Sequence, residues 1–437
     1  MRKNSNDLDK LALRLILASL TMVAAPALAG NCWGADWPQW RGPGRDAVAR
    51  ESGLLHQWPS NGPALMWTLK GLGRGYSSLA IAGGRLYTMG DLQEGGAKSQ
   101  YIIAFDLASR SRAWIARVGP PNGDGPRCTP TVDGEKVYAL GTEGDLLCVQ
   151  ADTGQEIWRK NLPRDFQGQM MSGWKYSESP LVDGEKLVCT PGGKQAALVA
   201  LNKQTGQVIW KCRPPNPELT GGAGYASIVP SQGAGARQYV TLMGHGVVGV
   251  SAADGKLLWT YERVANGTAN IPTPVVDGDF VFISTAYGGG AALLKLSKRE
   301  PGVKAQEVYF LRANTFQCHH GGFLKVGDYI YGADGQGQGN PICLEMATGK
   351  VKWKEKEPGS GSGAVLYADG LLFYRYEDDT VALIEANPEK YRLRGVFKAP
   401  HLPGMDGPGW VHPVVLEGKL YLRHNDVLLC YDVQGRR

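Results

Sequence analysis

The sequence predicts an all-β protein, folded as a single eight-bladed β-propeller of four-stranded antiparallel blades. The first indication is a repeated phrase in which a turn glycine precedes a tryptophan by four positions. It occurs at Gly154–Trp158, Gly206–Trp210, Gly255–Trp259 and Gly349–Trp353. A period of roughly 40 to 50 residues, built from strand signals, is typical of propeller repeats. An internal hairpin phrase and a count of first strands, described next, support the same fold.

Extending this period beyond the four tryptophans marks one aromatic residue in every repeat. Phe310 stands in the long interval between Trp259 and Trp353, where one degenerate copy is expected. The eight predicted marks are Trp67, Trp114, Trp158, Trp210, Trp259, Phe310, Trp353 and Phe397.

A second phrase inside the repeats predicts the first hairpin of each blade. Asp133-Gly134, Asp277-Gly278 and Asp369-Gly370 each separate two short apolar runs, the second of which contains Tyr or Phe. An Asp-Gly pair supplies the positive φ that a tight hairpin requires. A third strand, the Gly turn and a fourth strand with the aromatic mark then complete one blade.

The first strands also number eight, and they predict how the ring closes. They begin near Ser78, Thr129, Ser179, Ser227, Thr273, Gly322, Val365 and His412. The last repeat, residues 411–433, has only three strands, whereas the strand at 64–67 has no three strands before it. We expect this N-terminal strand to complete the last blade, which leaves no free sheet edge.

The N-terminus predicts export. Basic residues precede an apolar run from Leu15 to Ala29, which is the pattern of a secretory signal peptide and too short for a transmembrane segment. We therefore predict a signal peptide at 1–29, an N-terminal arm at 30–62 and a propeller at 63–437. The expected location is periplasmic or extracellular. A lipid anchor is disfavoured because Asn31, not a small residue, precedes Cys32.

Charge and cysteine content restrict the partners further. Residues 1–29 carry four basic and two acidic residues, which leaves a net charge of +4 on the remainder, too mild for a nucleic-acid surface. We expect a monomer. Cys148, Cys343 and Cys430 occupy one third-strand position in three different repeats, far apart around a ring, so we predict small buried apolar side chains rather than disulfides.

The repeat resembles that of the pyrroloquinoline quinone (PQQ) propeller superfamily, which typically reads Asp-x-x-Thr-Gly-x-x-x-Trp. The Thr-Gly to Trp half matches at Thr153, Thr205 and Thr348, whereas Gln150, Asn202 and Glu345 replace the usual Asp. The resemblance covers nearly the whole chain after residue 29. It implies one of two kinds of protein: quinoprotein alcohol dehydrogenases, or non-enzymatic propellers such as the BamB-like outer-membrane assembly factors.

The dehydrogenases of that superfamily bind PQQ with calcium, and the resemblance implies what they need: two adjacent disulfide-bonded cysteines, a ring-stacking Trp and carboxylate ligands for calcium. This sequence contains no adjacent cysteines, no Cys-x-x-Cys-His and no long insertions between repeats. We therefore predict a non-catalytic binding or scaffold module of the cell envelope without a cofactor. The alternatives are a PQQ-dependent dehydrogenase and, less favoured, a carbohydrate-active propeller enzyme.

The mouth of the central channel is the predicted ligand site. Aligning the repeats on their Asp-Gly turns brings aromatic and cationic residues into one ring and small hydroxyls into the next. The candidate binding residues are Tyr76, Arg127, Trp174, Tyr176, Glu178, Tyr225, His319, His320, Trp410 and His412. A protein or carbohydrate would use such stacking surfaces and directional donors. Alternatively, the side chains plug the channel and satisfy one another.

The adjacent histidines and the segment before the first repeat are both expected to have structural roles. His319 and His320 are adjacent, and adjacent strand residues point to opposite faces, so we predict no metal site. Trp37-Pro38-Gln39-Trp40-Arg41 has no counterpart in the repeats. We expect its two tryptophans to fix the arm to the propeller rather than to bind a partner.

Overall fold

A computed structural model describes residues 36–300, 302–356 and 358–435. All of them belong to one compact unit, Gly34–Arg437. The expected signal peptide and Cys32 lie outside the described residues. Within them, no helix is long and apolar enough to cross a membrane.

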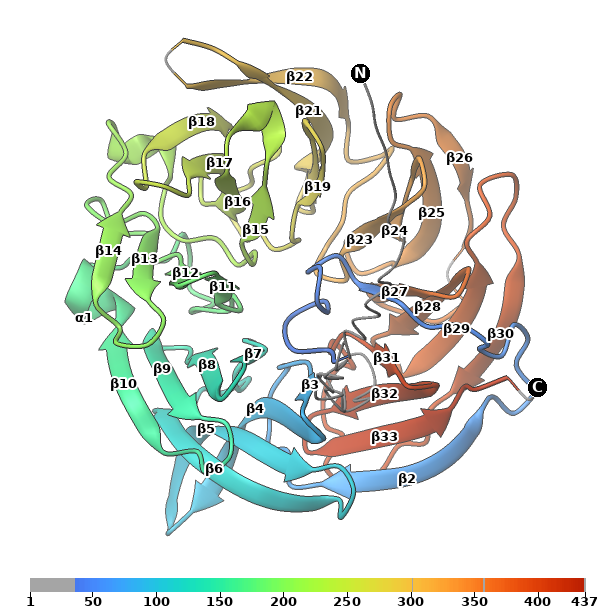
Figure 1. Cartoon of the computed structure of the whole chain (residues 1–437). Coiled ribbons are helices and arrows are strands. Elements are labelled where there is room, and N and C mark those ends of the chain that lie inside the picture. The colour runs from blue at the N-terminus through green and yellow to red at the C-terminus, as the bar shows by residue number, and fades with distance from the viewer. Residues whose placement is uncertain (1–35, 301, 357, 436–437) are drawn as a thin grey trace, which may run out of the picture. The chain divides into compact units, whose positions relative to one another are not determined.

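The unit is an eight-bladed β-propeller, as the repeats predicted (Figure 1). Blade 1 contains β3 (Ala80–Ala82), β4 (Arg85–Glu94), β5 (Ala97–Asp106) and β6 (Ser111–Gly119); blade 2 contains β7 (Thr131–Asp133), β8 (Lys136–Leu140), β9 (Asp145–Gln150) and β10 (Glu156–Asn161). Blade 3 contains β11 (Leu181–Asp183), β12 (Lys186–Cys189), β13 (Val199–Asn202) and β14 (Val208–Lys211); blade 4 contains β15 (Val229–Ser231), β16 (Gln238–Met243), β17 (Gly246–Ser251) and β18 (Leu257–Tyr261).

The second half of the ring repeats this order. Blade 5 contains β19 (Val275–Asp277), β20 (Phe280–Thr285), β21 (Gly290–Lys298) and β22 (Val303–Leu311); blade 6 contains β23 (Phe323–Val326), β24 (Tyr329–Asp334), β25 (Asn340–Glu345) and β26 (Val351–Lys354). Blade 7 contains β27 (Gly363–Ala368), β28 (Leu371–Tyr376), β29 (Thr380–Glu385) and β30 (Leu393–Lys398); blade 8 contains β31 (Val414–Leu416), β32 (Lys419–His424) and β33 (Val427–Asp432). The short helices are α1 (Leu162–Phe166), η1 (Pro217–Leu219) and η2 (Gly233–Gly235).

The ring closes as expected. Strand β2 (Ala64–Lys70) pairs antiparallel with β33 and supplies the fourth strand of blade 8. Blade 7 differs from the prediction because it has a fifth strand. Strand β1 (Val48–Ala49) of the N-terminal arm pairs parallel with β27, at the inner edge of that sheet.

The recurring glycine and tryptophan form the contact between neighbouring blades. The indole of Trp158 in blade 2 lies against Gly206 of blade 3, where an added Cβ would be 2.9 Å from the ring. Its Nε1 donates a hydrogen bond of 3.0 Å to the Lys203 carbonyl of the same turn. Trp114 and Trp210 repeat both contacts with the next blade. The turn requires glycine for its positive φ and for the space that the indole occupies.

The predicted role of the cysteines is confirmed for the described ones. Cys148, Cys343 and Cys430 are buried and free, and each is paired across the sheet with the aromatic mark of its own blade. Alanine or glycine takes the same place in blades 1, 3 and 4, opposite Trp114, Trp210 and Trp259. The position therefore selects a small side chain that leaves room for the large ring.

Two of the eight predicted marks need correction. In blade 5 the residue that follows the strand irregularity is Tyr309, not Phe310, and Tyr309 packs against Gly349 of the next blade. In blade 7 the equivalent residue is Gly395, and the arm residue Trp58 fills the space beside it. Trp58 also packs edge-on against Phe397, with ring centroids 5.2 Å apart.

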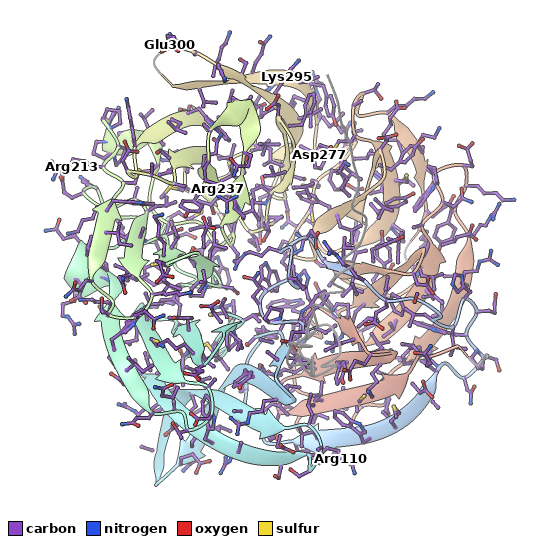
Figure 2. The ribbon with its side chains drawn as sticks, viewed as in Figure 1. Arg110, Arg213, Arg237, Asp277, Lys295 and Glu300 are labelled. Atoms are coloured by element: carbon purple, nitrogen blue, oxygen red, sulfur yellow. The ribbon has the colours of Figure 1, made fainter. Side chains whose placement is uncertain are left out.

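Charged side chains occur on several parts of the ring. Figure 2 labels Arg110, Arg213 and Glu300 on separate outer parts of the ring. Others are neutralised locally, as where Arg237 of blade 4 lies 2.7 Å from Asp183 of blade 3.

Candidate ligand-binding site at the channel mouth

The N-terminal arm runs into the centre of the ring, where it is drawn in dark blue in Figure 1. Trp37 forms a bridge with Ile81 of blade 1, and the Pro38 carbonyl accepts a hydrogen bond from Val132 N of blade 2. Trp37 is buried and belongs to the hydrophobic core that joins blades 1, 7 and 8. These contacts fix the arm to the propeller, as the sequence predicts.

Three other arm side chains reach across the centre. Arg45 donates to the carbonyls of Ser179 and Pro180 in blade 3, at 2.7 and 3.0 Å. Arg41 donates to the carbonyl of Phe323 in blade 6, and Trp40 Nε1 donates to Thr273 Oγ1 before blade 5 at 3.0 Å. The arm thus fastens opposite sides of the ring to one another.

Burial lowers the pKa of Arg41 and that of Arg45 to about 10, so both stay protonated at neutral pH. Their described hydrogen-bond partners are carbonyl and amide oxygens rather than carboxylates. Backbone carbonyls are good acceptors for a guanidinium, which explains how the centre tolerates two buried cations.

The predicted ring of small hydroxyls has a structural role over half of its circumference. Ser78 N donates to Thr129 Oγ1, Thr129 N donates to Ser179 Oγ, and Ser179 N donates to Ser227 Oγ. Each hydroxyl therefore satisfies a backbone N–H of the preceding blade, at 2.9 to 3.1 Å. Thr273 continues the series but accepts from Trp40 instead.

Above this layer lies a pocket with a cavity volume of about 210 Å³. Trp40 and Arg41 of the arm contribute to its lining, Tyr287 follows the second strand of blade 5, and the other residues come from the segments around the blades' first strands. Eight of the ten predicted binding residues line it: Tyr76, Arg127, Trp174, Tyr225, His319, His320, Trp410 and His412.

Tyr176 and Glu178 do not line this pocket, which corrects two of the predicted positions. Ser177 and Ser179 face it, and because side chains alternate along an extended chain, their neighbours point the other way. Tyr176 is buried and donates to the Pro191 carbonyl at 2.8 Å. Glu178 accepts hydrogen bonds from the backbone N–H and hydroxyl of Thr190. Burial raises the pKa of Glu178 to about 7.

Aromatic rings form one wall of the pocket. Trp410 lies between Tyr76 and His320, with ring centroids 4.8 and 5.0 Å away. His412 packs against Trp40 of the arm at 4.6 Å. These offset and tilted contacts hold the ring faces in fixed positions, which suits stacking against a flat or cyclic group of a ligand.

A half-exposed tryptophan and a cation form another part of the pocket lining. Trp174 is 52% exposed, although its loop is held by two bonds: Arg127 Nη1 donates to the Trp174 carbonyl at 3.0 Å, and Trp174 N donates to Tyr225 Oη at 3.3 Å. Arg127 also forms an ion pair with Asp124 at 2.8 Å. An exposed indole on an anchored loop at the pocket offers a stacking surface to a ligand.

The pocket favours neutral or anionic ligands. Its lining contains two arginines and three histidines but no Asp or Glu. Burial, with the nearby Arg41, lowers the pKa of His412 to about 3, and burial together with His320 lowers that of His319 to about 4. Both rings are therefore neutral at pH 7, and the two guanidinium groups carry the positive charge.

His319 and His320 lie closer than the sequence predicted. The strand begins only at Phe323, and the chain bends at His320, so the two rings approach to 4.4 Å and both line the pocket. Glu377 lies behind them, with Oε1 3.5 Å from His320 Nε2. Burial disfavours the charge on Glu377, but His320 and the Ser362 N–H outweigh it and lower its pKa to about 2.

The repeat alignment does not predict the lining residues Trp40, Arg41 and Tyr287. Trp40 is expected to fix the arm to the propeller, and no signal in the sequence places that arm, with Arg41, inside the ring. Tyr287 follows β20 in a turn with φ of 55° and hydrogen-bonds to His319 Nε2 at 2.8 Å. It belongs to no repeated position, so the repeat alignment had no signal for it.

A model of the family described as outer membrane protein assembly factor BamB matches residues 98–355. The chain belongs to this family. A BamB of Shewanella oneidensis is 25% identical over 257 residues, which are 56% of this chain and 60% of that protein. A BamB of Burkholderia pseudomallei is 26% identical over 198 residues, 44% of each chain. The chain therefore spans less than two thirds of the length of these relatives.

Solved structures show the same fold at low identity. BamB from Moraxella catarrhalis superposes with a TM-score of 0.59 and 13% identity, over 86% of this chain and 98% of that one. Quinohemoprotein alcohol dehydrogenase from Comamonas testosteroni gives a TM-score of 0.63 and 14% identity, over 92% and 81%. The propeller is thus common to BamB and to enzymes, and the fold alone does not decide between their functions.

The residues of the pocket do not fit PQQ with calcium. Calcium takes six to eight oxygen ligands in proteins, among them carboxylates, and the pocket lining has no carboxylate. The nearby Glu377 already accepts from Ser362 N and lies beside a histidine. The donor set in this BamB-family chain is therefore nitrogen-rich and aromatic.

Proposed function

We propose that this BamB-family chain is an exported, non-catalytic binding module of the cell envelope, and that it holds part of a protein or carbohydrate partner in the channel-mouth pocket. The observation that carries the proposal is the pocket itself: anchored aromatic rings and Arg127 surround a space of about 210 Å³. Such a lining offers stacking surface and donors but no carboxylate for acid–base chemistry.

The family match supports an envelope role, because the relatives are named outer membrane protein assembly factors. Export through the signal peptide at 1–29 and action as a monomer are parts of the same proposal. The intact mass of the exported protein tests the first part. A mass that corresponds to cleavage near Ala29 is expected, and a diacylglycerol-bearing Cys32 would contradict it.

A PQQ-dependent dehydrogenase is the second candidate, favoured by the fold similarity to quinohemoprotein alcohol dehydrogenase. The carbohydrate-active enzyme loses its main support, because Glu178 points away from the pocket into a hydrogen-bonded buried site. Glycoside hydrolysis needs a pair of carboxyl groups beside the substrate, and none lines this pocket.

A dye-linked oxidation assay separates the first two candidates. The purified full chain is incubated with PQQ and calcium and offered primary alcohols and aldoses, with a quinoprotein dehydrogenase as the positive control. We expect no dye reduction above the protein-free rate. Activity that requires both PQQ and calcium and disappears with Trp410→Ala would replace the binding proposal with the dehydrogenase.

A further inference from the structure

We propose that His319, His320 and Glu377 form a binding site for a divalent transition metal ion, of which zinc is the best match, at the wall of the channel-mouth pocket. Each residue offers one ligand atom, and these atoms all lie within 4.8 Å of one another. Two imidazoles and one carboxylate are a donor set that suits zinc and its neighbours rather than calcium or magnesium.

The separation of His320 and Glu377 already matches a metal site. The 3.5 Å between His320 Nε2 and Glu377 Oε1 compares with about 3.4 Å between two ligands bound about 2.1 Å from one tetrahedral ion. His320 Nε2 is buried and makes no hydrogen bond to any described residue. A buried ring nitrogen without a hydrogen bond is costly, and a metal ion between it and the carboxylate would satisfy both groups.

His319 is held in place by hydrogen bonds at both ring nitrogens. Nδ1 lies 2.8 Å from Ser362 Oγ, and Nε2 lies 2.8 Å from Tyr287 Oη. Whichever nitrogen binds the ion, the other keeps a hydroxyl partner that fixes the ring, as is usual for metal-bound histidines. The His319 nitrogen that binds the ion would lose its hydrogen bond to the hydroxyl and form the bond to the metal instead.

Glu377 is oriented in the same way. Its Oε1 accepts a hydrogen bond of 2.8 Å from Ser362 N, so Ser362 touches two of the three ligands. The ligands come from the segment before blade 6 and from the β28–β29 turn of blade 7, which the fold holds side by side. Such a preformed set loses little entropy when the ion binds.

Three protein ligands leave a fourth position open. Because His319 and His320 both line the pocket, that position can be reached from it. An ion there would offer a Lewis-acidic contact to an oxygen or anionic group of whatever the pocket binds. Metal binding at these three residues does not depend on the identity of the partner.

The test is a zinc titration of the tag-free full chain, monitored by isothermal titration calorimetry. The chain is first treated with a chelator to remove bound metal. One equivalent of Zn²⁺ should bind, and His320→Ala and Glu377→Gln should each weaken binding at least about tenfold. His401→Ala is the control, because His401 is exposed and lies outside the pocket. The zinc affinity of the His401→Ala variant should equal that of the wild type.

Cobalt provides a second readout. A Co²⁺-loaded wild-type chain should show the visible absorption of a four-coordinate ion, and the His320→Ala variant should lose it. Circular dichroism establishes whether each variant is folded. If His320→Ala does not fold, His320→Gln takes its place. Failure of the wild type to bind one equivalent, or unchanged affinity in both ligand variants, would overturn the proposal.

Discussion

The contact between the turn glycine and the tryptophan of the preceding blade predicts a specific cost for one methyl group. Gly206 has a φ of 70°, and a Cβ there would lie 2.9 Å from Trp158 Cδ2. The left-handed conformation alone costs a non-glycine residue roughly 1–2 kcal/mol. Overpacking against a fixed ring adds about 1–3 kcal/mol. We therefore expect Gly206→Ala to lower the free energy of unfolding by about 2–5 kcal/mol.

Gly184 provides a matched control in the same blade. Its φ is 59°, but no atom lies within 4 Å of the position of an added Cβ. Gly184→Ala should therefore cost only the conformational part, about 1–2 kcal/mol. Urea denaturation followed by tryptophan fluorescence measures both variants. If the two glycine variants are equally stable, the turn glycine is needed for its conformation alone, and the steric account of the repeat is refuted.

Three other predictions concern Trp158, Glu178 and Arg127. Trp158→Ala should lower the free energy of unfolding by about 3–5 kcal/mol in denaturant melts, and unaltered melts would remove the role assigned to the repeat. Burial raises the pKa of Glu178 to about 7, so its contribution to stability is complete below pH 4.5 and is lost as pH rises through 7. Melting curves from pH 4.5 to 8 should thus show wild type losing stability relative to Glu178→Gln, and parallel curves would contradict this. Arg127→Ala should weaken partner binding by about 1–3 kcal/mol in a quantitative binding assay while changing the melting temperature little; full affinity or an unfolded variant would count against the pocket.

The sequence predicted most of the fold because the repeat encodes local chemistry. The glycine turn, the small residue opposite Trp158 and the Asp-Gly hairpins each follow from the geometry of one blade and its neighbour. The prediction failed where two aromatic residues stood together: Tyr309, not Phe310, has the packing position, because the strand irregularity shifts the register by one.

The site was less predictable because it depends on contacts between distant segments. Repeat alignment placed Tyr76, Arg127, Tyr225 and Trp410 correctly around one pocket, since equivalent positions meet at the centre of the ring. It could not foresee that Arg45 of the arm crosses that centre to the carbonyls of blade 3.

Local departures from strand geometry account for the rest. Adjacent side chains point to opposite faces of a strand. Ser177 and Ser179 face the pocket, so this rule points Glu178, which lies between them in the sequence, away from it. The same rule fails at His319 and His320, because the chain bends there before β23 begins. Alternation therefore holds only where the backbone is regularly extended.

Site-specific photo-crosslinking tests most directly whether the channel mouth is the binding site. A photoreactive phenylalanine analogue at Trp174, 52% exposed at the pocket, is compared with the same analogue at Leu393, 44% exposed on outer strand β30. Irradiated cells that express the chain natively should give a discrete crosslinked product from position 174 and none from 393, and Arg127→Ala should reduce its yield. A product from position 393 alone, or none from 174, would contradict the assignment of the channel mouth as the binding site.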